Sequence, residues 1–211
     1  MLKLIGKIIK FIITLGVVIV IFVGGFFAVR TYKSVKTVTS YRSEVQQAAD
    51  EAGVGKYTDV ILGIMYTESK GKGTDLMQSS ESAYGSRGQI DSQKESIEIG
   101  VEHFAQSYKL ASAAGCDLAT AIQAYNFGTK YIDFVKDNGG KNSVELAEEY
   151  SRDVLSPGFG NDQQETYRYM KWQSVLYNGG YLYRDGGNMF YAELVQTNKQ
   201  FITWYERFQK S

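Results

Sequence analysis

The sequence predicts a mainly α-helical protein that joins one N-terminal transmembrane helix to one helical domain. Three observations support this fold class. Residues 11–29 are uncharged and almost wholly apolar, apolar side chains recur at helical spacing through most of the remaining chain, and the only proline is Pro157. A chain with so little proline can form uninterrupted helices, because proline removes a backbone donor and clashes with the preceding turn.

The apolar run at residues 11–29 is long enough to cross a bilayer. As a helix it would be about 28 Å long, close to the thickness of the hydrocarbon core. A cleaved secretory signal is the alternative, because Lys3, Lys7 and Lys10 form a basic leading segment. The run is longer than a signal core and no small-residue cleavage site follows it, so we expect an uncleaved anchor. Basic residues flank the run on both sides and leave its orientation undecided.

The composition limits the remaining possibilities. The 211 residues, 44% of them hydrophobic, suit one domain of ordinary size after the anchor. Lys and Arg together number 23, as do Asp and Glu, and no basic stripe indicates a nucleic-acid partner. Cys116 is the only cysteine and His103 the only histidine. An intrachain disulfide is therefore impossible, a four-ligand structural zinc site is excluded, and we expect neither a metal nor a cofactor.

The domain's helices are predicted from apolar spacing, taken in chain order. They cover residues 57–68, 97–108, 118–125, a stretch that begins near Asn142 and Ser143 and carries apolar residues to Tyr150, 167–174 and 190–208. Asp117 is the expected N-cap of the third helix and Gly128 its stop signal. Asp162 and Glu165 form a D-x-x-E capping pattern ahead of the fifth helix. The only strand-like segment, residues 181–183, is too short to predict a strand.

Glu68 is the candidate catalytic residue. It shares a helix face with five apolar side chains and lies at the C-terminal end of that helix. Burial disfavours the charged form of a carboxylate, and the helix dipole disfavours negative charge at this end, so both raise its pKa. A carboxylic acid that stays protonated near neutral pH is what general acid catalysis of glycosidic cleavage requires. The alternative is a residue at a helix end that turns toward solvent.

Two motifs accompany Glu68. Glu68-Ser69 is followed by TDLMQSSES at residues 74–82, and AIQAYNFG follows at residues 121–128. Their order resembles the lysozyme-like superfamily of goose-type lysozymes and soluble lytic transglycosylases, in which an E-S at a helix end, a G-L-M-Q segment and an A-Y-N-x-G helix converge on one cleft. Over roughly residues 45–180 the chain is most similar to the lysozyme-like domain of Gram-positive cell-wall hydrolases often found on conjugative elements.

The resemblance implies a mainly α-helical, lysozyme-like catalytic domain that cleaves β-1,4 bonds between N-acetylmuramic acid and N-acetylglucosamine in peptidoglycan. It implies that Glu68 is the general acid. It also implies a set of substrate-binding residues, namely Ser69, Gln78, Ser79, Ser80, Tyr125 and Asn126.

A second carboxylate is less clearly indicated. Classical glycosidases use a second carboxylate as nucleophile or base, and Asp75 and Glu81 belong to the matched motif. Either one could instead cap a loop or lie in solvent, and Ser80 stands where goose-type lysozymes carry an aspartate. A lytic transglycosylase needs no such partner, because one glutamate serves as acid and then as base. Both reactions, muramidase and lytic transglycosylase, remain open at this stage.

Two other functions compete with this interpretation. Cys116 lies just before an expected helix start, where a thiolate would be stabilised, so a peptidase using Cys116 and His103 is conceivable. This requires contact between the two residues, and we instead expect His103 at the surface and Cys116 in a structural role. The other alternative is a non-catalytic, membrane-anchored protein that binds peptidoglycan or acts as a scaffold for a secretion apparatus.

The expected organisation has three parts. Residues 1–30 form a cytoplasmic tail and the anchor, residues 31–44 a polar tether, and residues 45–211 the lysozyme-like domain. Because the glycan lies outside the cell, we expect a single-pass protein of the cell membrane whose domain faces the wall. Its expected partners are peptidoglycan, the membrane and, from the resemblance, a secretion or conjugation apparatus.

Overall fold

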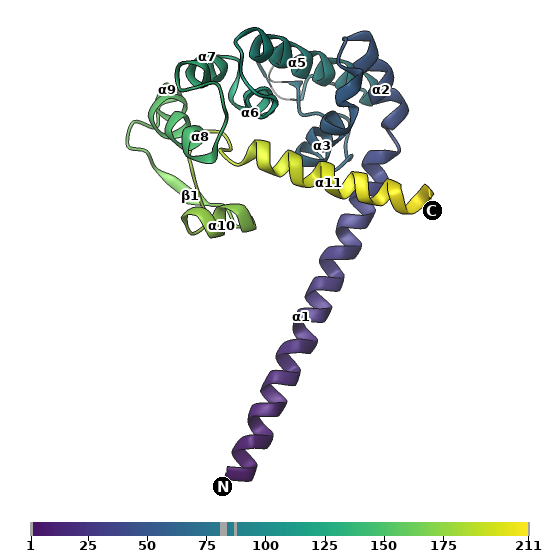
Figure 1. Cartoon of the computed structure of the whole chain (residues 1–211), viewed down its shortest axis with the longest axis vertical. Helices are drawn as coiled ribbons and strands as arrows, with labels where there is room; N and C mark the ends of the chain where they lie inside the picture. The colour runs from purple at the N-terminus through teal and green to yellow at the C-terminus, as the bar shows by residue number, and fades with distance from the viewer. Residues whose placement is uncertain (1, 81–83, 87, 211) are drawn as a thin grey trace.

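The computed structural model describes residues 2–80, 84–86 and 88–210. Figure 1 shows a long helix, α1 (Leu2–Thr39), that leads into a helical domain. The elements of that domain, in chain order, are α2 (Arg42–Glu51), η1 (Gly55–Tyr57), α3 (Thr58–Glu68), α5 (Gln93–Ala113), α6 (Leu118–Phe127), α7 (Lys130–Asp137), α8 (Val144–Tyr150), η2 (Ser151–Leu155), α9 (Ser156–Gly158), β1 (Thr166–Arg168), α10 (Trp172–Asn178), β2 (Tyr181–Tyr183) and α11 (Tyr191–Lys210).

Helix α1 has two parts with different surroundings. Its apolar part, which includes residues 11–29, is exposed along its length, and within the described residues α1 is the one helix long and apolar enough to cross a membrane. Its last turns pack into the domain, where Val35 and Val38 are buried. The polar segment expected to be a tether at residues 31–44 is therefore mostly helix. Apolar residues one turn apart within a polar sequence give it a packing face.

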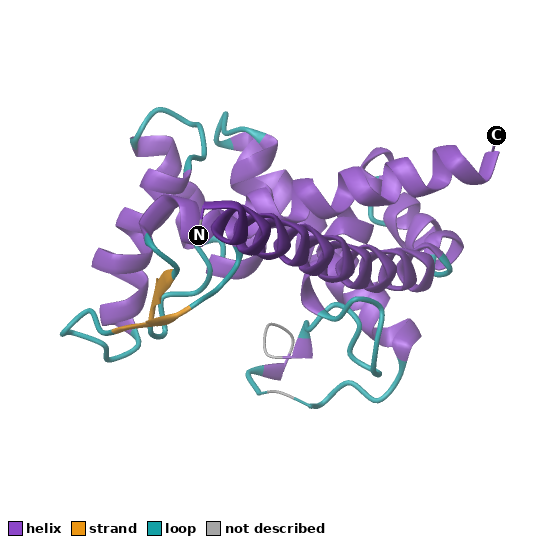
Figure 2. Cartoon of the chain, turned by 90° about the horizontal axis from the view of Figure 1, so that it is seen from below, coloured by secondary structure: helices purple, strands orange, loops and turns teal. Residues whose placement is uncertain are grey.

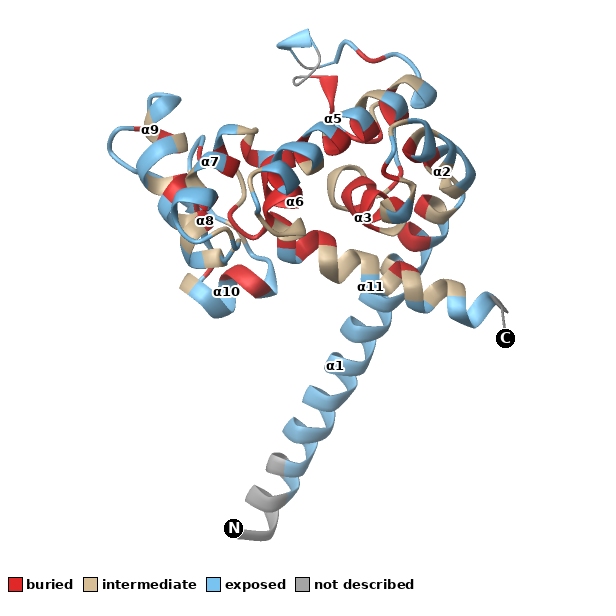
Figure 3. Ribbon diagram, turned by 45° about the horizontal axis from the view of Figure 1, so that its top comes forward, coloured by how far each residue is buried: buried red, intermediate tan, exposed pale blue. Residues whose placement is uncertain are grey.

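Helix α3 lies at the centre of the domain. Every residue from Val60 to Tyr66 is buried, as the red colour of α3 in Figure 3 shows. Side chains of α2, α5, α6 and α11 belong to the same apolar cluster. Helix α11 approaches α3 closely because Gly63 has no side chain; a Cβ there would lie 2.8 Å from the backbone oxygen of Val195. A second apolar cluster, built around Phe127, Tyr131 and Tyr150, packs between the end of α6 and the helices α7 and α8.

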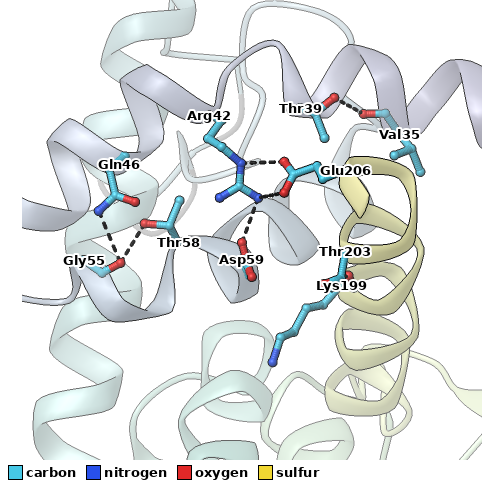
Figure 4. A network of polar contacts seen from close by, with 10 residues as sticks. All are labelled: Val35, Thr39, Arg42, Gln46, Gly55, Thr58, Asp59, Lys199, Thr203 and Glu206. Carbon is cyan, nitrogen blue, oxygen red and sulfur yellow. Dashed lines mark hydrogen bonds and ion pairs between the residues drawn. The ribbon is translucent and has the colours of Figure 1, made fainter. Parts of the chain in front are cut away.

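An ion-pair network joins α2, α3 and the C-terminal part of α11 (Figure 4). Arg42 donates from Nε to Oε1 of Glu206 over 2.6 Å and from Nη2 to Oε2 over 2.9 Å, and Nη2 also donates to Asp59 over 2.7 Å. Bidentate pairing of a planar guanidinium restricts geometry more than a single contact does. The network therefore holds the end of α11 beside the point where α1 enters the domain.

The structure confirms most of the expected helices and corrects one. Asp117 caps α6 by accepting from the amide of Thr120 over 2.9 Å, and Gly128 ends that helix with φ of +84°. The helix expected at residues 167–174 is wrong over its first part, because Thr166–Arg168 is strand β1, which pairs with β2 in the two-stranded antiparallel sheet drawn in orange in Figure 2. Helix begins only at Trp172, the first residue of α10. Gln164 takes a left-handed φ of +54°, which breaks the helical path after the apparent capping pattern.

Candidate functional site

Glu68 is the last residue of α3. The helix ends there because Ser69 leaves the helical conformation, and Lys70 and Gly71 follow with left-handed φ angles of +58° and +73°. Ser69 stabilises this turn with its hydroxyl, which donates to the carbonyl of Leu76 over 2.7 Å and accepts from the amide of Gly71 over 3.0 Å. The turn leaves the Glu68 side chain directed into a cleft rather than covered by another helical turn.

The carboxyl of Glu68 is largely enclosed by aromatic side chains. The Tyr191 hydroxyl, from the first turn of α11, donates to its Oε1 over 2.5 Å. The ring of Tyr125 is stacked parallel to that of Tyr191, with centroids 6.2 Å apart. Burial raises the pKa of Glu68 to about 7; the Tyr191 hydrogen bond acts against this rise, and the charge of Asp75 adds to it. Glu68 can therefore carry a proton at neutral pH.

Asp75 belongs to the same cleft but has polar surroundings. Its carboxylate accepts four hydrogen bonds, from the hydroxyls of Ser80 over 2.6 Å and Ser96 over 2.8 Å, and from the amides of Ser79 and Ser80 over 3.1 and 3.2 Å. Partial burial would raise the pKa of Asp75, but these donors outweigh it and hold the pKa below its usual range. Asp75 is therefore ionised at neutral pH.

The cleft has a volume of about 740 Å³. One part of its lining comes from the end of α3, the loop before α5 and α5 itself, and another from the end of α6. The rest comes from residues near η2, α9 and the loop before α11. The lining residues are Glu68, Asp75, Gln78, Ser80, Gly88, His103, Tyr125, Asn126, Phe127, Gly128, Leu155, Phe159, Asp185 and Gly187. Carboxyls, amides, hydroxyls and aromatic rings together suit a polar ligand with apolar faces, such as a glycan.

Five of the residues expected in the site line this cleft together with Glu68. They are Asp75, Gln78, Ser80, Tyr125 and Asn126. Two of them also hold the cleft together: the Tyr125 hydroxyl donates to the carbonyl of Met77 over 2.9 Å, and Asn126 Oδ1 accepts from the amide of Asn188 over 2.7 Å. These bonds connect the end of α6 to the loop before α5 on one side and to the loop before α11 on the other.

The other expected site residues are placed differently. Ser69 and Ser79 are not among the lining residues: the hydroxyl of Ser69 is engaged in the turn after α3, and Ser79 is buried, with its hydroxyl 3.5 Å from the carbonyl of Ser96. The Ser69 side chain thus contacts the loop that follows α3 and the Ser79 side chain contacts α5, and their contact with substrate stays a prediction. Glu81, the other candidate for the second carboxylate, lies outside the described residues.

The sequence did not indicate the roles of two aromatic side chains of the site, Tyr191, which donates to Glu68, and His103, which lines the cleft. Tyr191 lies 123 positions from Glu68, and only the Gly-Gly pair before its helix could have drawn attention to it. His103 packs edge-on against Tyr125 with ring centroids 4.6 Å apart, and its Nε2 lies 3.2 Å from the Tyr125 carbonyl. His103 is therefore half-buried in the cleft lining and not on the open surface expected for it, and burial lowers its pKa.

The alternative pairing of His103 with Cys116 gains no support from the geometry. The Cys116 sulfur lies 3.8 Å from the carbonyl of Ile132, away from the lining of the cleft. Burial and the charge of Asp117 raise the pKa of the thiol, which opposes thiolate formation. Within the part of the chain that the structure describes, no three His, Cys, Asp or Glu side chains are grouped to hold a metal ion.

Residues 35–199 match the lysozyme-like family. Among curated proteins, the pneumococcal vaccine antigen A of Streptococcus pneumoniae serotype 4 is 39% identical over 89% of this chain and 91% of its own length. The bifunctional muramidase/DL-endopeptidase CwlT of Bacillus subtilis is 39% identical over 54% of this chain and 34% of its own. The uncharacterised membrane protein YocA of the same bacterium is 46% identical over 54% of this chain and 51% of its own.

A solved structure has the same fold. It is a protein of Staphylococcus aureus described as similar to a lipoprotein of the NLP/P60 family, and it superposes with a TM-score of 0.71 at 34% identity. The match covers 77% of this chain and 52% of the solved one, so this chain spans about half the length of that structure.

Proposed function

The chain belongs to the lysozyme-like family, and from this premise we propose that it is a muramidase. It cleaves the β-1,4 bond between N-acetylmuramic acid and N-acetylglucosamine in peptidoglycan, with Glu68 as the general acid. The observation that carries this proposal is a carboxyl whose pKa is raised to about 7 and which faces a cleft. The 39% identity to a protein named as a muramidase supports the same substrate class.

The hydrogen bonding of Glu68 indicates where its transferable proton resides. Tyr191 donates to Oε1, which makes this oxygen the acceptor of the protonated carboxyl. Oε2 makes no hydrogen bond to the described part of the chain and is the oxygen that carries the proton. On substrate binding, Oε2 gives this proton to the glycosidic oxygen, and the carbon–oxygen bond to the leaving sugar breaks. The resulting Glu68 carboxylate then accepts a proton from the attacking water.

Asp75 is the proposed second carboxylate. The transition state of glycoside cleavage carries positive charge on the sugar ring, and a nearby carboxylate stabilises it. Asp75 is held ionised by four donors and lines the same cleft. Near neutral pH it therefore carries a negative charge while Glu68 can still carry a proton. The two carboxyls thus have the opposite protonation states that a glycosidase requires.

The remaining lining residues are proposed to bind the sugars. Gln78, Ser80 and Asn126 offer amide and hydroxyl groups to N-acetyl and hydroxyl substituents, and the exposed ring of Phe159 offers a flat apolar surface. Tyr125 positions the cleft through its bond to the Met77 carbonyl. Ser69 and Ser79 also support the loop that carries Asp75.

The location of the substrate implies the location of the domain. We propose that α1 anchors the protein in the cell membrane and that the domain faces the wall outside the cell. The exposed apolar part of α1 supports an anchor, and the relative named as a membrane protein agrees with it. A secretion or conjugation apparatus as partner stays a prediction from the sequence.

The test is digestion of purified peptidoglycan by the full chain and by Glu68→Gln. We expect the variant to lose about 100- to 10,000-fold in rate, the usual contribution of a general acid. Glu149→Gln is the matched control, because Glu149 is exposed on α8 away from the cleft. Equal digestion by Glu68→Gln and wild type would refute the assignment.

The products then identify the reaction. Mass spectrometry should find reducing N-acetylmuramic acid ends, since Asp75 supplies the second carboxylate of a hydrolase. Anhydro ends would instead establish lytic transglycosylase chemistry, with Glu68 as both acid and base. Binding of peptidoglycan without any cleavage by wild type would support the non-catalytic scaffold.

A further inference from the structure

Most of the strongly exposed apolar side chains of the domain lie on or next to α10 and the C-terminal half of α11, which together form one face. Beyond α1, the six large apolar side chains with the highest exposure are Phe208 at 80%, Leu176 at 78%, Phe159 at 71%, Met170 at 66%, Trp172 at 61% and Trp204 at 57%. Phe159 lines the cleft. The other five lie on α10, directly before it, or on the C-terminal half of α11. Both tryptophans of the chain are among them.

This face adjoins the point at which α1 leaves the domain. Figures 1 and 3 both show α10 and α11 on the side of the domain from which α1 extends. The aromatic side chains of α11 meet α1 directly: Trp204 and Tyr205 line an apolar groove with Phe27 and Tyr32. The rings of Tyr32 and Tyr205 contact each other edge to face, with centroids 5.5 Å apart. Trp204 therefore lies at the level where the apolar span of α1 ends.

A group of basic side chains lies on the same side. The turn after α3 packs against the domain end of α1, since a Cβ on Gly71 would lie 3.0 Å from Thr37 Cγ2. This turn carries Lys70 and Lys72. Burial lowers the pKa of Lys70, and the nearby charges of Lys171, Arg30 and Lys72 lower it further. Lys171 directly precedes α10, so the basic group extends from the anchor to the exposed apolar side chains.

We propose that the face formed by α10 and the C-terminal half of α11 rests on the membrane in which α1 is anchored, against anionic lipid. Tryptophan is enriched where a protein meets the headgroup region, because its ring is apolar and its N–H is polar. Exposed apolar side chains beside basic ones are the pattern of helices that lie in a bilayer interface. The lipid surface is the occupant favoured here, because α1 brings this face to the membrane.

The inference limits how the domain can be oriented. A domain joined to its anchor by a flexible tether could turn freely above the membrane, whereas α1 continues as a helix into the core. Contact of α10 with lipid, together with the Arg42 network that holds the end of α11, would fix the direction in which the cleft opens. The inference rests on the membrane anchoring proposed above but not on catalysis.

The two tryptophans allow a direct test on the full chain. The chain is placed in nanodiscs of equal parts phosphatidylcholine and phosphatidylglycerol, with brominated phosphatidylcholine as the lipid-borne quencher. Trp204→Phe leaves Trp172 as the only tryptophan, and we expect a roughly twofold loss of its emission, since side chains at an interface reach the acyl boundary. We also expect protection of Trp172 from iodide in the water.

Two reporters separate the docking from the anchor. In a variant with both tryptophans changed to phenylalanine, Phe22→Trp reports insertion of α1 and Leu110→Trp reports the exposed surface of α5, on the opposite side of the domain. Lipid quenching at Phe22→Trp but not at Trp172 would overturn the docking while leaving the anchor intact. Iodide quenching of Trp172 as strong as that of the tryptophan in Leu110→Trp would also overturn the docking.

Two further variants test the contributions of apolar and basic groups, each in the Trp204→Phe background. Leu176→Ser should reduce the quenching of Trp172, whereas the matched change Leu110→Ser should leave it unaltered. Lys72→Gln combined with Lys171→Gln should also reduce it, and only where phosphatidylglycerol is present. Equal quenching of Trp172 with and without phosphatidylglycerol would overturn the role of anionic lipid.

Discussion

The two carboxyl groups of the cleft, Glu68 on an apolar side and Asp75 on a polar side, have opposite surroundings. Glu68 is enclosed by Tyr125 and Tyr191 and receives one hydrogen bond, whereas Asp75 lies in a loop that supplies four donors. The first environment raises the pKa to about 7 and the second lowers it. The difference shows that desolvation dominates where few donors are present, and that hydrogen bonds dominate where a loop directs several donors at one group.

After the loss expected for Glu68→Gln, the largest effect should come from removing the charge of Asp75. Asp75→Asn keeps the size of the side chain but removes the charge proposed to stabilise the transition state. We expect a loss in rate of about 100- to 1,000-fold, as for other groups that stabilise developing charge. The measurement is release of soluble fragments from peptidoglycan at several pH values. A rate within a few-fold of wild type, with anhydro products, would assign the reaction to Glu68 alone.

The buried carboxyl of Glu68 should make the protein less stable as pH rises. Because burial raises the pKa of Glu68 from 4.5 to about 7, the folded state binds this proton more tightly than the unfolded state does. The free energy of unfolding therefore falls between these two pH values, by up to about 3 kcal/mol.

Glu68→Gln has no proton to lose, so its stability relative to wild type should increase across this pH window. Thermal unfolding of the full chain in detergent, followed by near-UV circular dichroism, measures the change. Asp75 should act in the opposite direction, because its pKa is lowered on folding. Its contribution to stability is present above the unfolded pKa and is lost in acid, so Asp75→Asn should differ from wild type least at low pH. Parallel stability curves for wild type and Glu68→Gln would contradict the buried environment of Glu68.

The smallest expected effect is a shift of the pH profile caused by Tyr191→Phe. The hydroxyl of Tyr191 lowers the pKa of Glu68, so its removal should raise that pKa by up to about one unit, the worth of one hydrogen bond to a charged group. The alkaline limb of the pH–rate profile should move upward by the same amount, while the rate in mild acid changes little. A uniform loss of rate without a shift would indicate that Tyr191 only supports the fold.

Local features of the site were predictable from the sequence, and contacts between distant segments were not. The end of α3 at Glu68 follows from Ser69 and the glycines after it, and the limits of α6 follow from Asp117 and Gly128, all within a few residues. By contrast, the donor from Ser96 to Asp75 comes from 21 positions away and that from Tyr191 to Glu68 from 123. No spacing rule connects such residues.

The wrong helix prediction at residues 167–171 has the same origin. Tyr167, Met170 and Ser174 are spaced as in a helix, and a capping pattern precedes them. The segment nevertheless forms a strand, because Tyr181–Tyr183 is available to pair with it and Gln164 turns the chain before it. A short segment follows its tertiary partner when local propensity is weak.

The sequence by itself determined that an apolar helix precedes a helical domain, that a glutamate ends one of its helices, and that a loop rich in hydroxyl groups follows it. Only the tertiary structure decided which carboxyl would hold a proton and which would hold a charge. The physical reason is that a pKa depends on the water excluded and the donors supplied by everything packed around the group. For Glu68 and Asp75, much of that packing comes from α6, α11 and α5, which are distant in the chain.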